Sequence, residues 1–251
     1  LTGAFGLGIL AFAVKLLVAV AVAKMPDQVV KPLVAANTLD SGSAVPAFPA
    51  TPADLPEHTV WQALPMEAPA PMDNPTTPEK VALGKRLFFD PRLSADGTLS
   101  CSSCHALEQH AGADGRSTAL GIRAQTGSRN TPTVFNTAFQ SVLFWDGRAA
   151  SLEEQAKGPI LNPMEMGMPS GAESARRVRS DLTYREDFAR VFGPGTAITL
   201  DRIADAIAAY ERTLITPDTP YDRFVGGDKK ALDAAQLRGM ALFESLGCVS
   251  C

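Results

Sequence analysis

The run Cys101-Ser102-Ser103-Cys104-His105 constrains this chain more than any other feature of its sequence. Cys-x-x-Cys-His is the attachment signature of a c-type haem. Cys101 and Cys104 share a face of one helical turn, so their sulfurs can form thioethers along one haem edge. His105 follows directly and can bind the iron as proximal ligand. One alternative is a redox dithiol, but the surrounding βαβ pattern that such a dithiol needs is not found. The other is half of a zinc site, but the second pair of zinc ligands is not nearby. The run therefore predicts covalently bound haem.

The other two cysteines form a second pair, Cys248-Val249-Ser250-Cys251, at the end of the sequence. Beside the first motif, this pair indicates a second haem attachment site whose histidine would be the next residue. Because the sequence also starts at Leu1 rather than at a methionine, we expect a fragment with one complete haem site and one interrupted site. These two pairs use all four cysteines and leave none for a structural disulfide.

Length, charge and periodicity limit the fold class. A chain of 251 residues can bury the cores of one or two domains. The net charge of −4 provides no basic field, so we expect no nucleic-acid partner. Helical periodicity and capping signals dominate, whereas the alternating pattern of strands is scarce. The sequence predicts a mostly α protein made of c-type cytochrome domains.

Local signals predict where the helices lie. Thr77 is a typical N-cap with Pro78 at the first helical position, and the helix that it opens ends at Asp90-Pro91. Residues 106–131 have the composition of a loop. Further helices are expected from the capping boxes Ser151/Glu154 and Thr183/Glu186, from the apolar series Leu200, Ile203, Ile207, Tyr210 and Leu214, and from about Asp233 to Leu246 with Gly247 as C-cap.

Residues 1–23 are apolar apart from Thr2 and Lys15. As a helix they would reach about 35 Å, enough to cross a hydrocarbon core of about 30 Å. The alternative is a signal peptide with Ala21-Val22-Ala23 as its cleavage site. We favour the membrane anchor because of the length. Both alternatives export the chain, so we expect a periplasmic protein, anchored to the inner membrane or released by cleavage.

A Pro/Ala-rich segment, residues 24–76, follows the apolar stretch. A run of this composition buries too little apolar surface to fold by itself and is expected to be an extended linker. His58 and Trp61 lie within it, and we expect both to be solvated rather than docked.

Several motifs in order resemble the bacterial di-haem cytochrome c peroxidases and their MauG-like relatives. The first runs from Leu83 to Ser94 (LGKRLFFDPRLS) and precedes the haem motif. The resemblance continues through residues 129–133 (RNTPT), 144–149 (FWDGRA), 158–166 (GPILNPMEM) and 222–224 (DRF), and through the final Gly247-Cys248 segment. It covers residues 77–251 and implies two c-haem domains: a peroxidatic one at 77–215 and the start of an electron-transfer one at 216–251.

The resemblance also implies roles for individual residues. Glu165 would be the acid/base of the peroxide pocket, since a carboxylate over the open iron face can move a proton between the two peroxide oxygens. Trp145 would lie between the two haems on the path of the electrons. Asn130 would contribute to a calcium site between the domains, because an amide oxygen suits this hard cation.

One position departs from the family pattern. Many members carry a histidine in the loop after the first haem motif, and that histidine caps the iron in the resting oxidised enzyme. Ile122 stands at this position, and isoleucine cannot bind iron. His110, the nearest other histidine, is expected to be a loop residue. We therefore predict that the first haem is open to peroxide in the oxidised protein.

Three functions are consistent with these residues. The first is reduction of hydrogen peroxide with electrons from a small donor protein, a cytochrome c or a cupredoxin. For this enzyme a homodimer is a further expected assembly. The second is MauG-like oxidation of a protein side chain. The third is plain electron transfer, in which Met164, Met166 or Met168 closes the sixth position of the first haem.

Overall fold

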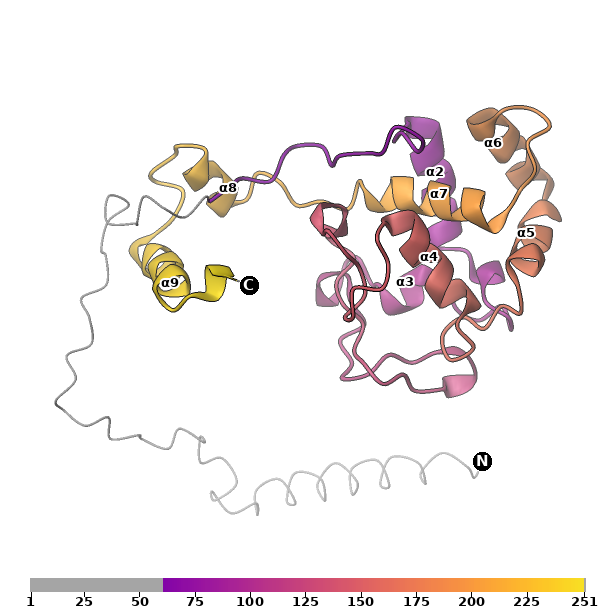
Figure 1. Cartoon of the computed structure of the whole chain (residues 1–251), viewed down its shortest axis with the longest axis horizontal. Helices are drawn as coiled ribbons and strands as arrows, with labels where there is room; N and C mark the ends of the chain where they lie inside the picture. The colour runs from indigo at the N-terminus through magenta and orange to yellow at the C-terminus, as the bar shows by residue number, and fades with distance from the viewer. Residues whose placement is uncertain (1–60, 251) are drawn as a thin grey trace, which may run out of the picture. The chain divides into compact units, whose positions relative to one another are not determined.

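The computed structural model describes residues 61–250, which form a helical protein (Figure 1). The longer helices are α2 (Pro78–Phe88), α4 (Leu152–Leu161), α5 (Gly171–Arg179), α6 (Leu182–Phe192), α7 (Leu200–Glu211) and α9 (Ala234–Ser245). Two short helices, α3 (Cys101–Cys104) and α8 (Pro220–Val225), complete the set. Within the described range there is no β-strand, only the isolated bridges Leu120–Thr126 and Leu143–Ala149. The predicted mostly α class is confirmed.

Helices α2 and α7 pack directly against each other and form the centre of the core (Figure 1). Leu87 and Phe88 of α2 and Ile203 of α7 are fully buried, and Ile207 is nearly so. Gly84 lets the two backbones approach closely, since a Cβ at this position would lie 1.8 Å from the carbonyl oxygen of Ala206. Helix α4 packs on the same α7 and α6 packs on α2. Buried residues of both helices belong to one hydrophobic core cluster.

The cap residues decide most helix boundaries. Thr77 caps α2 by accepting a hydrogen bond from the Lys80 N–H at 3.3 Å, as predicted. Asp233, near which the last helix was expected to begin, caps α9 by accepting from the Gln236 N–H at 2.8 Å. The prediction for α6 was wrong: Asp181, rather than Thr183, is the N-cap, because its carboxylate accepts from the N–H groups of both Thr183 and Tyr184. The predicted C-cap of α9 was one residue late: the structure has Leu246 there, and Gly247 follows at φ +78°.

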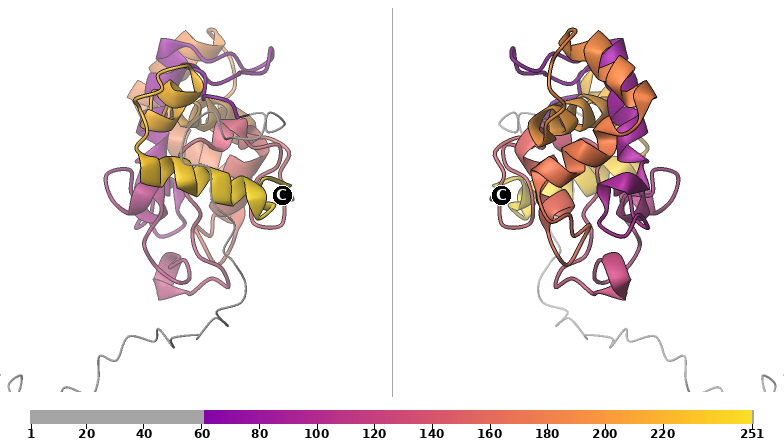
Figure 2. Two further views of the ribbon diagram at one scale, coloured as in Figure 1. Left: turned by 90° about the vertical axis from the view of Figure 1, so that its left-hand side faces the viewer. Right: turned by 90° about the vertical axis from the view of Figure 1, so that its right-hand side faces the viewer.

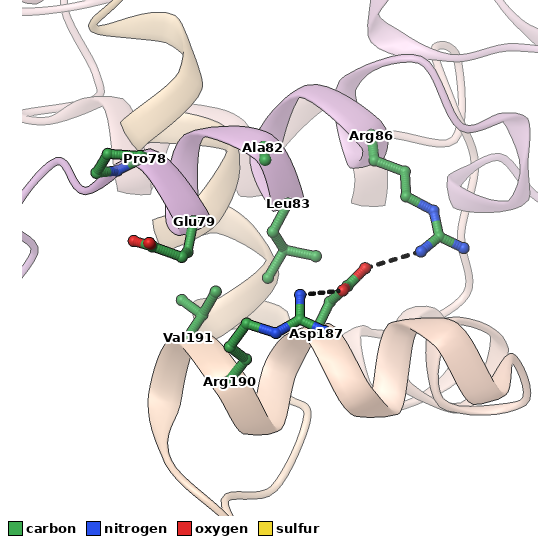
Figure 3. Close-up of a pocket in the computed structure, with 8 residues that line it drawn as sticks. All are labelled: Pro78, Glu79, Ala82, Leu83, Arg86, Asp187, Arg190 and Val191. Carbon is green, nitrogen blue, oxygen red and sulfur yellow. Dashed lines mark hydrogen bonds and ion pairs between the residues drawn. The ribbon is translucent and has the colours of Figure 1, made fainter.

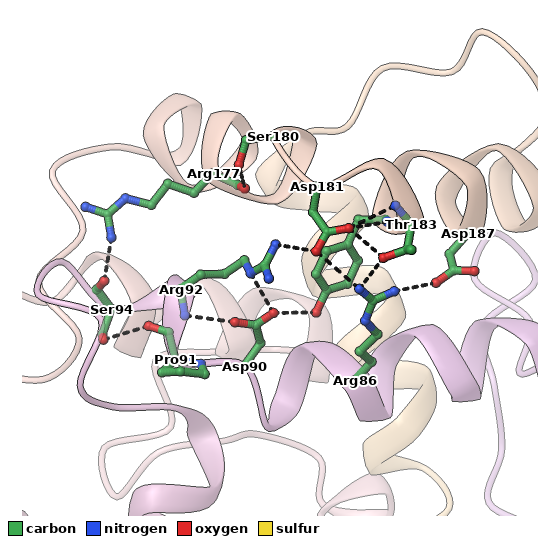
Figure 4. A network of polar contacts seen from close by, with 11 residues as sticks. Arg86, Asp90, Pro91, Arg92, Ser94, Arg177, Ser180, Asp181, Thr183 and Asp187 are labelled. Atoms are coloured by element: carbon green, nitrogen blue, oxygen red, sulfur yellow. Dashed lines mark hydrogen bonds and ion pairs between the residues drawn. The ribbon is translucent and has the colours of Figure 1, made fainter.

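A polar network fixes the turn η2 (Pro91–Leu93), which leads into the cysteine motif (Figure 4). The Arg92 guanidinium contacts Asp90 at 2.7 Å and Asp181 at 3.0 Å. The buried Tyr184 donates its hydroxyl proton to Asp90 at 2.7 Å. Arg177 of α5 donates to the carbonyl oxygen of Ser94 at 2.8 Å. Helices α5 and α6 thereby hold the chain segment just before Cys101.

The segment between α3 and α4 contains only the short turns η3 (His110–Gly112), η4 (Ile122–Ala124) and η5 (Thr137–Phe139). Figure 2 follows these loops, in magenta and rose, from two further sides. Residues 106–131 are therefore loop, as predicted. Such loops can bring side chains together from many directions, and most of the functional residues lie on them or next to them.

The end of the predicted linker makes specific contacts. Trp61 packs edge-on against Tyr221 of α8, with ring centroids 6.1 Å apart, and lies 6.3 Å from the ring of Phe243 of α9. The Leu64 N–H donates to the Asp222 carboxylate at 2.8 Å. The expectation that Trp61 is solvated was therefore wrong, because aromatic partners distant in sequence bury part of it. His58 lies outside the described residues.

Among residues 61–250, no helix is long and apolar enough to cross a membrane. Residues 1–23, to which the anchor or signal peptide was assigned, lie outside the described residues, as does most of the segment 24–76.

Candidate functional site

The first cysteine motif lines a large cavity of about 1100 Å³. Ordinary small-molecule pockets measure roughly 300–1,000 Å³, so this one suits a large, flat ligand. Its walls come from α3, from the loops around residues 120 and 130, from α4 and from the last two turns of α7. Cys101, Cys104, His105, Trp145 and Glu165 all line it. The fold thus brings together five predicted site residues from three separate segments.

Helix α3 is a single turn that presents both cysteines to the cavity. The turn is closed at its start by the Ser100 N–H, which donates to the Ser103 hydroxyl at 3.0 Å. Both thiols are free and partly buried. Burial raises the pKa of the Cys101 and Cys104 thiols, so both are neutral near pH 7. Two free thiols on one helical face are placed for attachment to the two vinyl groups of a haem.

His105 has its ring orientation set by the backbone. Its Nδ1 lies 3.1 Å from the carbonyl oxygen of Gly112, which fixes Nδ1 as the protonated nitrogen. Nε2 is then unprotonated and available to a metal. The fully buried Phe88 lies 6.5 Å from the imidazole, ring centroid to ring centroid. Burial lowers the pKa of His105, so the neutral imidazole that iron binding needs is favoured.

Glu165 is held in the cavity wall by its own loop and by a neighbouring one. Asn162 donates its side-chain N–H to the Glu165 carboxylate at 2.7 Å, and the Ile122 N–H donates to the Glu165 carbonyl at 2.8 Å. Burial raises the pKa of Glu165, while the Asn162 hydrogen bond and the charge of Arg148 lower it. A carboxyl that is buried and oriented in this way is placed to take up and release a proton.

Trp145 and Asn130 meet at the edge of the cavity. The Trp145 indole N–H donates to the Asn130 carbonyl at 3.0 Å, and 61% of the Trp145 residue surface is exposed. Asn130 also lines the cavity. Residues 61–250 contain no group of three or more His, Cys, Asp or Glu side chains able to hold a metal ion. The calcium site at Asn130 stays a prediction.

Three cavity residues were missed by the sequence analysis. Gln155 of α4 lines the cavity together with Glu165. Thr131 and Glu211, 7% and 6% exposed, line it as well, and neither the Thr131 hydroxyl nor the Glu211 Oε2 has a hydrogen-bond partner in the described structure. Glu211 lies four residues after the buried Ile207, so the helical spacing places it on the apolar face of α7. This spacing was the sequence signal that could have identified Glu211 as buried.

The residues present fit a c-type haem. The two thiols would attach the haem covalently, and the free Nε2 of His105 would bind its iron. Buried polar atoms without partners, such as the Thr131 hydroxyl, are expected where a bound group would satisfy them. Arg129 and Arg148 also line the cavity, and their positive charge suits the two carboxylates of a haem.

A family model described as di-haem cytochrome c peroxidase matches residues 78–230, more than half of the chain. The chain belongs to this family. The matched range contains the first cysteine motif, Asn130, Trp145 and Glu165, whereas the pair at Cys248 lies beyond it. Cys248 is a free, exposed cysteine, and Cys251 lies outside the described residues.

Individual members of the di-haem cytochrome c peroxidase family are similar over most of this chain. The cytochrome c peroxidase Ccp of Escherichia coli is 47% identical over 73% of this chain and 39% of that protein. The cytochrome c551 peroxidase of Nitrosomonas europaea is 47% identical over 70% of this chain and 52% of that protein. The MauG protein of Methylophilus methylotrophus is 41% identical over 79% of this chain and 59% of that protein. The chain thus spans about 39–59% of the length of these relatives.

A solved structure has the same fold. The crystal structure of a MauG-like protein associated with microbial copper homeostasis aligns with a TM-score of 0.67 and 36% identity, over 79% of this chain and 57% of that one. This similarity of fold agrees with the family that the sequence shows.

Ile122 stands at the position where many members of the di-haem cytochrome c peroxidase family have a capping histidine. Ile122 is 3% exposed and does not line the cavity. Its side chain points at Gly167, where a Cβ would lie 2.3 Å from the Ile122 Cδ1. His110 is exposed and packs over Gly115, away from the cavity. Of the three candidate methionine ligands, Met164 and Met166 line the cavity and Met168 does not.

A second hollow of about 480 Å³ lies between α2 and α6 (Figure 3). Its most prominent polar feature is Asp187, which bridges Arg86 and Arg190 at 2.9 Å each. No cysteine or histidine lines it. This hollow is a charged surface groove and contains no candidate for the chemistry of the first cavity.

Proposed function

We propose that this chain carries the peroxidatic haem of a di-haem cytochrome c peroxidase, which reduces hydrogen peroxide to water with electrons from a small periplasmic donor protein. The observation that supports this most is that His105 and Glu165, 60 residues apart in sequence, line one cavity together with both cysteines. When bound, the haem supplies the iron at which peroxide is reduced. The net reaction takes one peroxide, two electrons and two protons to two waters.

The chain's own residues divide the work. Cys101 and Cys104 would hold the haem covalently, and His105, oriented by the Gly112 carbonyl, would bind its iron. Glu165 takes the proton from one peroxide oxygen and returns it to the other oxygen, which leaves as water. Asn162 keeps the Glu165 carboxyl in place for both transfers.

The remaining assignments belong to the same proposal. Residues 77–215 form the peroxidatic domain and residues 216–251 begin the electron-transfer domain, whose haem is attached through Cys248 and Cys251. Trp145 carries electrons from the second haem, and its 61% exposure agrees with a surface that meets another part of the protein. Asn130 contributes one ligand of a calcium site. The protein is periplasmic, and residues 1–23 anchor or export it.

MauG-like oxidation of a protein side chain is the second candidate. Two observations favour it. One is the 41% identity to a MauG protein, and the other is that Ile122 stands at the position of the capping histidine and packs outside the cavity. The two enzymes differ in what consumes the oxidising equivalents. Rapid turnover of peroxide with a reduced small cytochrome supports the peroxidase, and turnover only in the presence of a protein substrate supports the MauG-like reaction.

The test of the proposal is Glu165→Gln. This change keeps the shape and removes the titratable proton, so peroxide cleavage should slow by about 10²–10⁴-fold. The measurement is single-turnover mixing of the haem-loaded protein with hydrogen peroxide, followed by absorbance. The matched control is Glu154→Gln, which changes an exposed carboxyl of α4 that does not line the cavity. A near-normal rate in Glu165→Gln, with an unchanged haem spectrum, would show that Glu165 is not the acid/base.

A further inference from the structure

Glu211, the last residue of α7, is a buried acid that the proposed chemistry does not use. It lines the haem cavity, is 6% exposed, and its Oε2 has no hydrogen-bond partner in the described structure. The residues before it in the same turn, Ala208 and Ala209, are fully buried. The packing of α7 against α2 and α4 therefore forces this carboxyl inward.

The charged groups around Glu211 do not form an ion pair with it. Arg212 is the cation whose charge favours ionisation of Glu211, but its guanidinium donates to Glu153 of α4, with which it forms an ion pair. The negative charge of Glu153 opposes ionisation of Glu211, and the thiol of Cys101 on α3 and the hydroxyl of Tyr210 on α7 are the other titratable groups that its charge affects. Arg129, Arg148, His105 and Glu165 line other parts of the same cavity.

A carboxylate in these surroundings is costly, because it has lost its water and gained no partner. Burial accordingly raises the pKa of Glu211 to about 8, against the opposing effect of Arg212. The acid is thus neutral at pH 7 and loses its proton only in mildly alkaline solution.

We propose that Glu211 couples protonation to electron transfer in this cavity in mildly alkaline solution, where it takes up one proton when the haem gains one electron. The inference rests on the proposed haem at Cys101, Cys104 and His105. In balanced form, the Glu211 carboxylate, one solvent proton and one donor electron give the neutral carboxyl and a haem reduced by one electron. The only bond that forms is the O–H bond of Glu211. The physical reason is that an added electron in a medium of low dielectric raises the energy of a nearby carboxylate.

The predicted signature is a pH-dependent reduction potential. At low pH Glu211 is protonated in both oxidation states, so the potential does not change with pH. Once the pH exceeds the pKa in the oxidised state, the potential falls as the pH rises. The limiting slope is about 59 mV per unit for one proton and one electron, because one pH unit is a tenfold change in proton concentration.

The experiment is a spectroelectrochemical titration of the haem-loaded protein between about pH 6 and pH 10. Glu211→Gln should match the wild type at the acid end, show no alkaline fall, and have the higher potential at the alkaline end. Two controls should keep the fall: Glu165→Gln, which neutralises the other cavity carboxyl, and Glu154→Gln, which lies outside the cavity. Reduction of the wild type at alkaline pH should also add the infrared carbonyl band of a protonated carboxylic acid, which serves as a readout without any substitution.

A wild-type potential that stays constant across this range, with no such infrared band, would overturn the inference. An equal alkaline fall in Glu211→Gln would do the same, because another group would then carry the proton. Failure of the proposed function is distinguishable from failure of the inference. A protein that binds haem but does not turn over peroxide would still show the alkaline fall in potential, whereas a wild type without a c-type haem spectrum would remove the haem on which the inference rests.

Discussion

Replacing Gly84 by alanine tests the packing that positions the cavity. Gly84 lies in α2 at the point where it meets α7, and an alanine Cβ there would lie 1.8 Å from the Ala206 carbonyl oxygen and 2.9 Å from the Tyr210 Cβ. The obstacle is backbone, so no side chain can rotate away. To restore an ordinary contact of 3.4 Å, the helices must separate by about 1.6 Å.

The magnitude follows from two opposing effects. Overpacking of a core costs about 1–3 kcal/mol and sometimes more, and a backbone obstacle places Gly84→Ala at or above the upper end. Alanine is the better helix former by about 1 kcal/mol, which offsets part of this cost. The net loss is then about 2–3 kcal/mol in the free energy of unfolding. For a protein of this size, that lowers Tm by roughly 5–10 °C.

The assay is thermal unfolding of the haem-loaded variants followed by circular dichroism. Gly239→Ala in α9 is the matched control, since it makes the same chemical change in a helix where no atom lies within 4 Å of the new Cβ. Its Tm should stay the same or rise. Equal Tm values for Gly84→Ala and the wild type would refute the reasoning that α2 and α7 meet through this glycine.

Two further predictions concern the loop that carries Ile122. Gly121→Ala would bring a Cβ to 1.7 Å from the Met164 carbonyl oxygen and displace the loop of Glu165, so the peroxide reaction should slow by about 10²-fold while the haem spectrum persists. The control Gly127→Ala, whose new Cβ has its nearest neighbouring atom at 3.5 Å, should react normally. Equal rates for the two variants in stopped-flow mixing would contradict the prediction. Because Ile122 packs on Gly167 outside the cavity, the first haem of the oxidised full-length protein should be high-spin and react with peroxide without prior reduction. Electron paramagnetic resonance showing two low-spin haems, inert to peroxide until reduced, would show that another ligand closes the site.

The parts of the fold that the sequence predicted correctly depend on neighbouring residues. Thr77 and Asp233 cap α2 and α9 because an N-cap needs only a side-chain oxygen and the next turn of backbone. Where two caps compete, as at Asp181 and Thr183, the choice is made by the surroundings: Asp181 also pairs with Arg86 and Arg92, which come from far away in the sequence.

Helix α5 was missed for a related reason. Its sequence, from Gly171 to Arg179, is rich in arginine, and its buried face consists largely of small residues, Ser174 and Ala175, with Val178. Such a face gives almost no apolar periodicity. The helix is stabilised instead by contacts with η2 and α6 that no local pattern contains.

The candidate site divides in the same way. Cys101, Cys104 and His105 follow from a contiguous motif whose chemistry is fixed by spacing, and the structure places all three in one cavity. Glu165 and Trp145 could be named only through resemblance to a family, since a single carboxyl or indole has no local signature. Glu211 became visible only with the packing of α7, because the lack of partners that makes it unusual is a property of the tertiary structure.

The most direct test of the central claim is whether residues 101–105 carry covalent haem. Trypsin should release Leu93–Arg116 as one peptide, because no lysine or arginine lies between Arg92 and Arg116. From protein matured in a periplasm, mass spectrometry of this peptide should show the added mass of one haem, retained after denaturation, together with the c-type band in the reduced pyridine spectrum. An unmodified Leu93–Arg116 peptide with two free thiols would contradict the assignment of this cavity as a haem site.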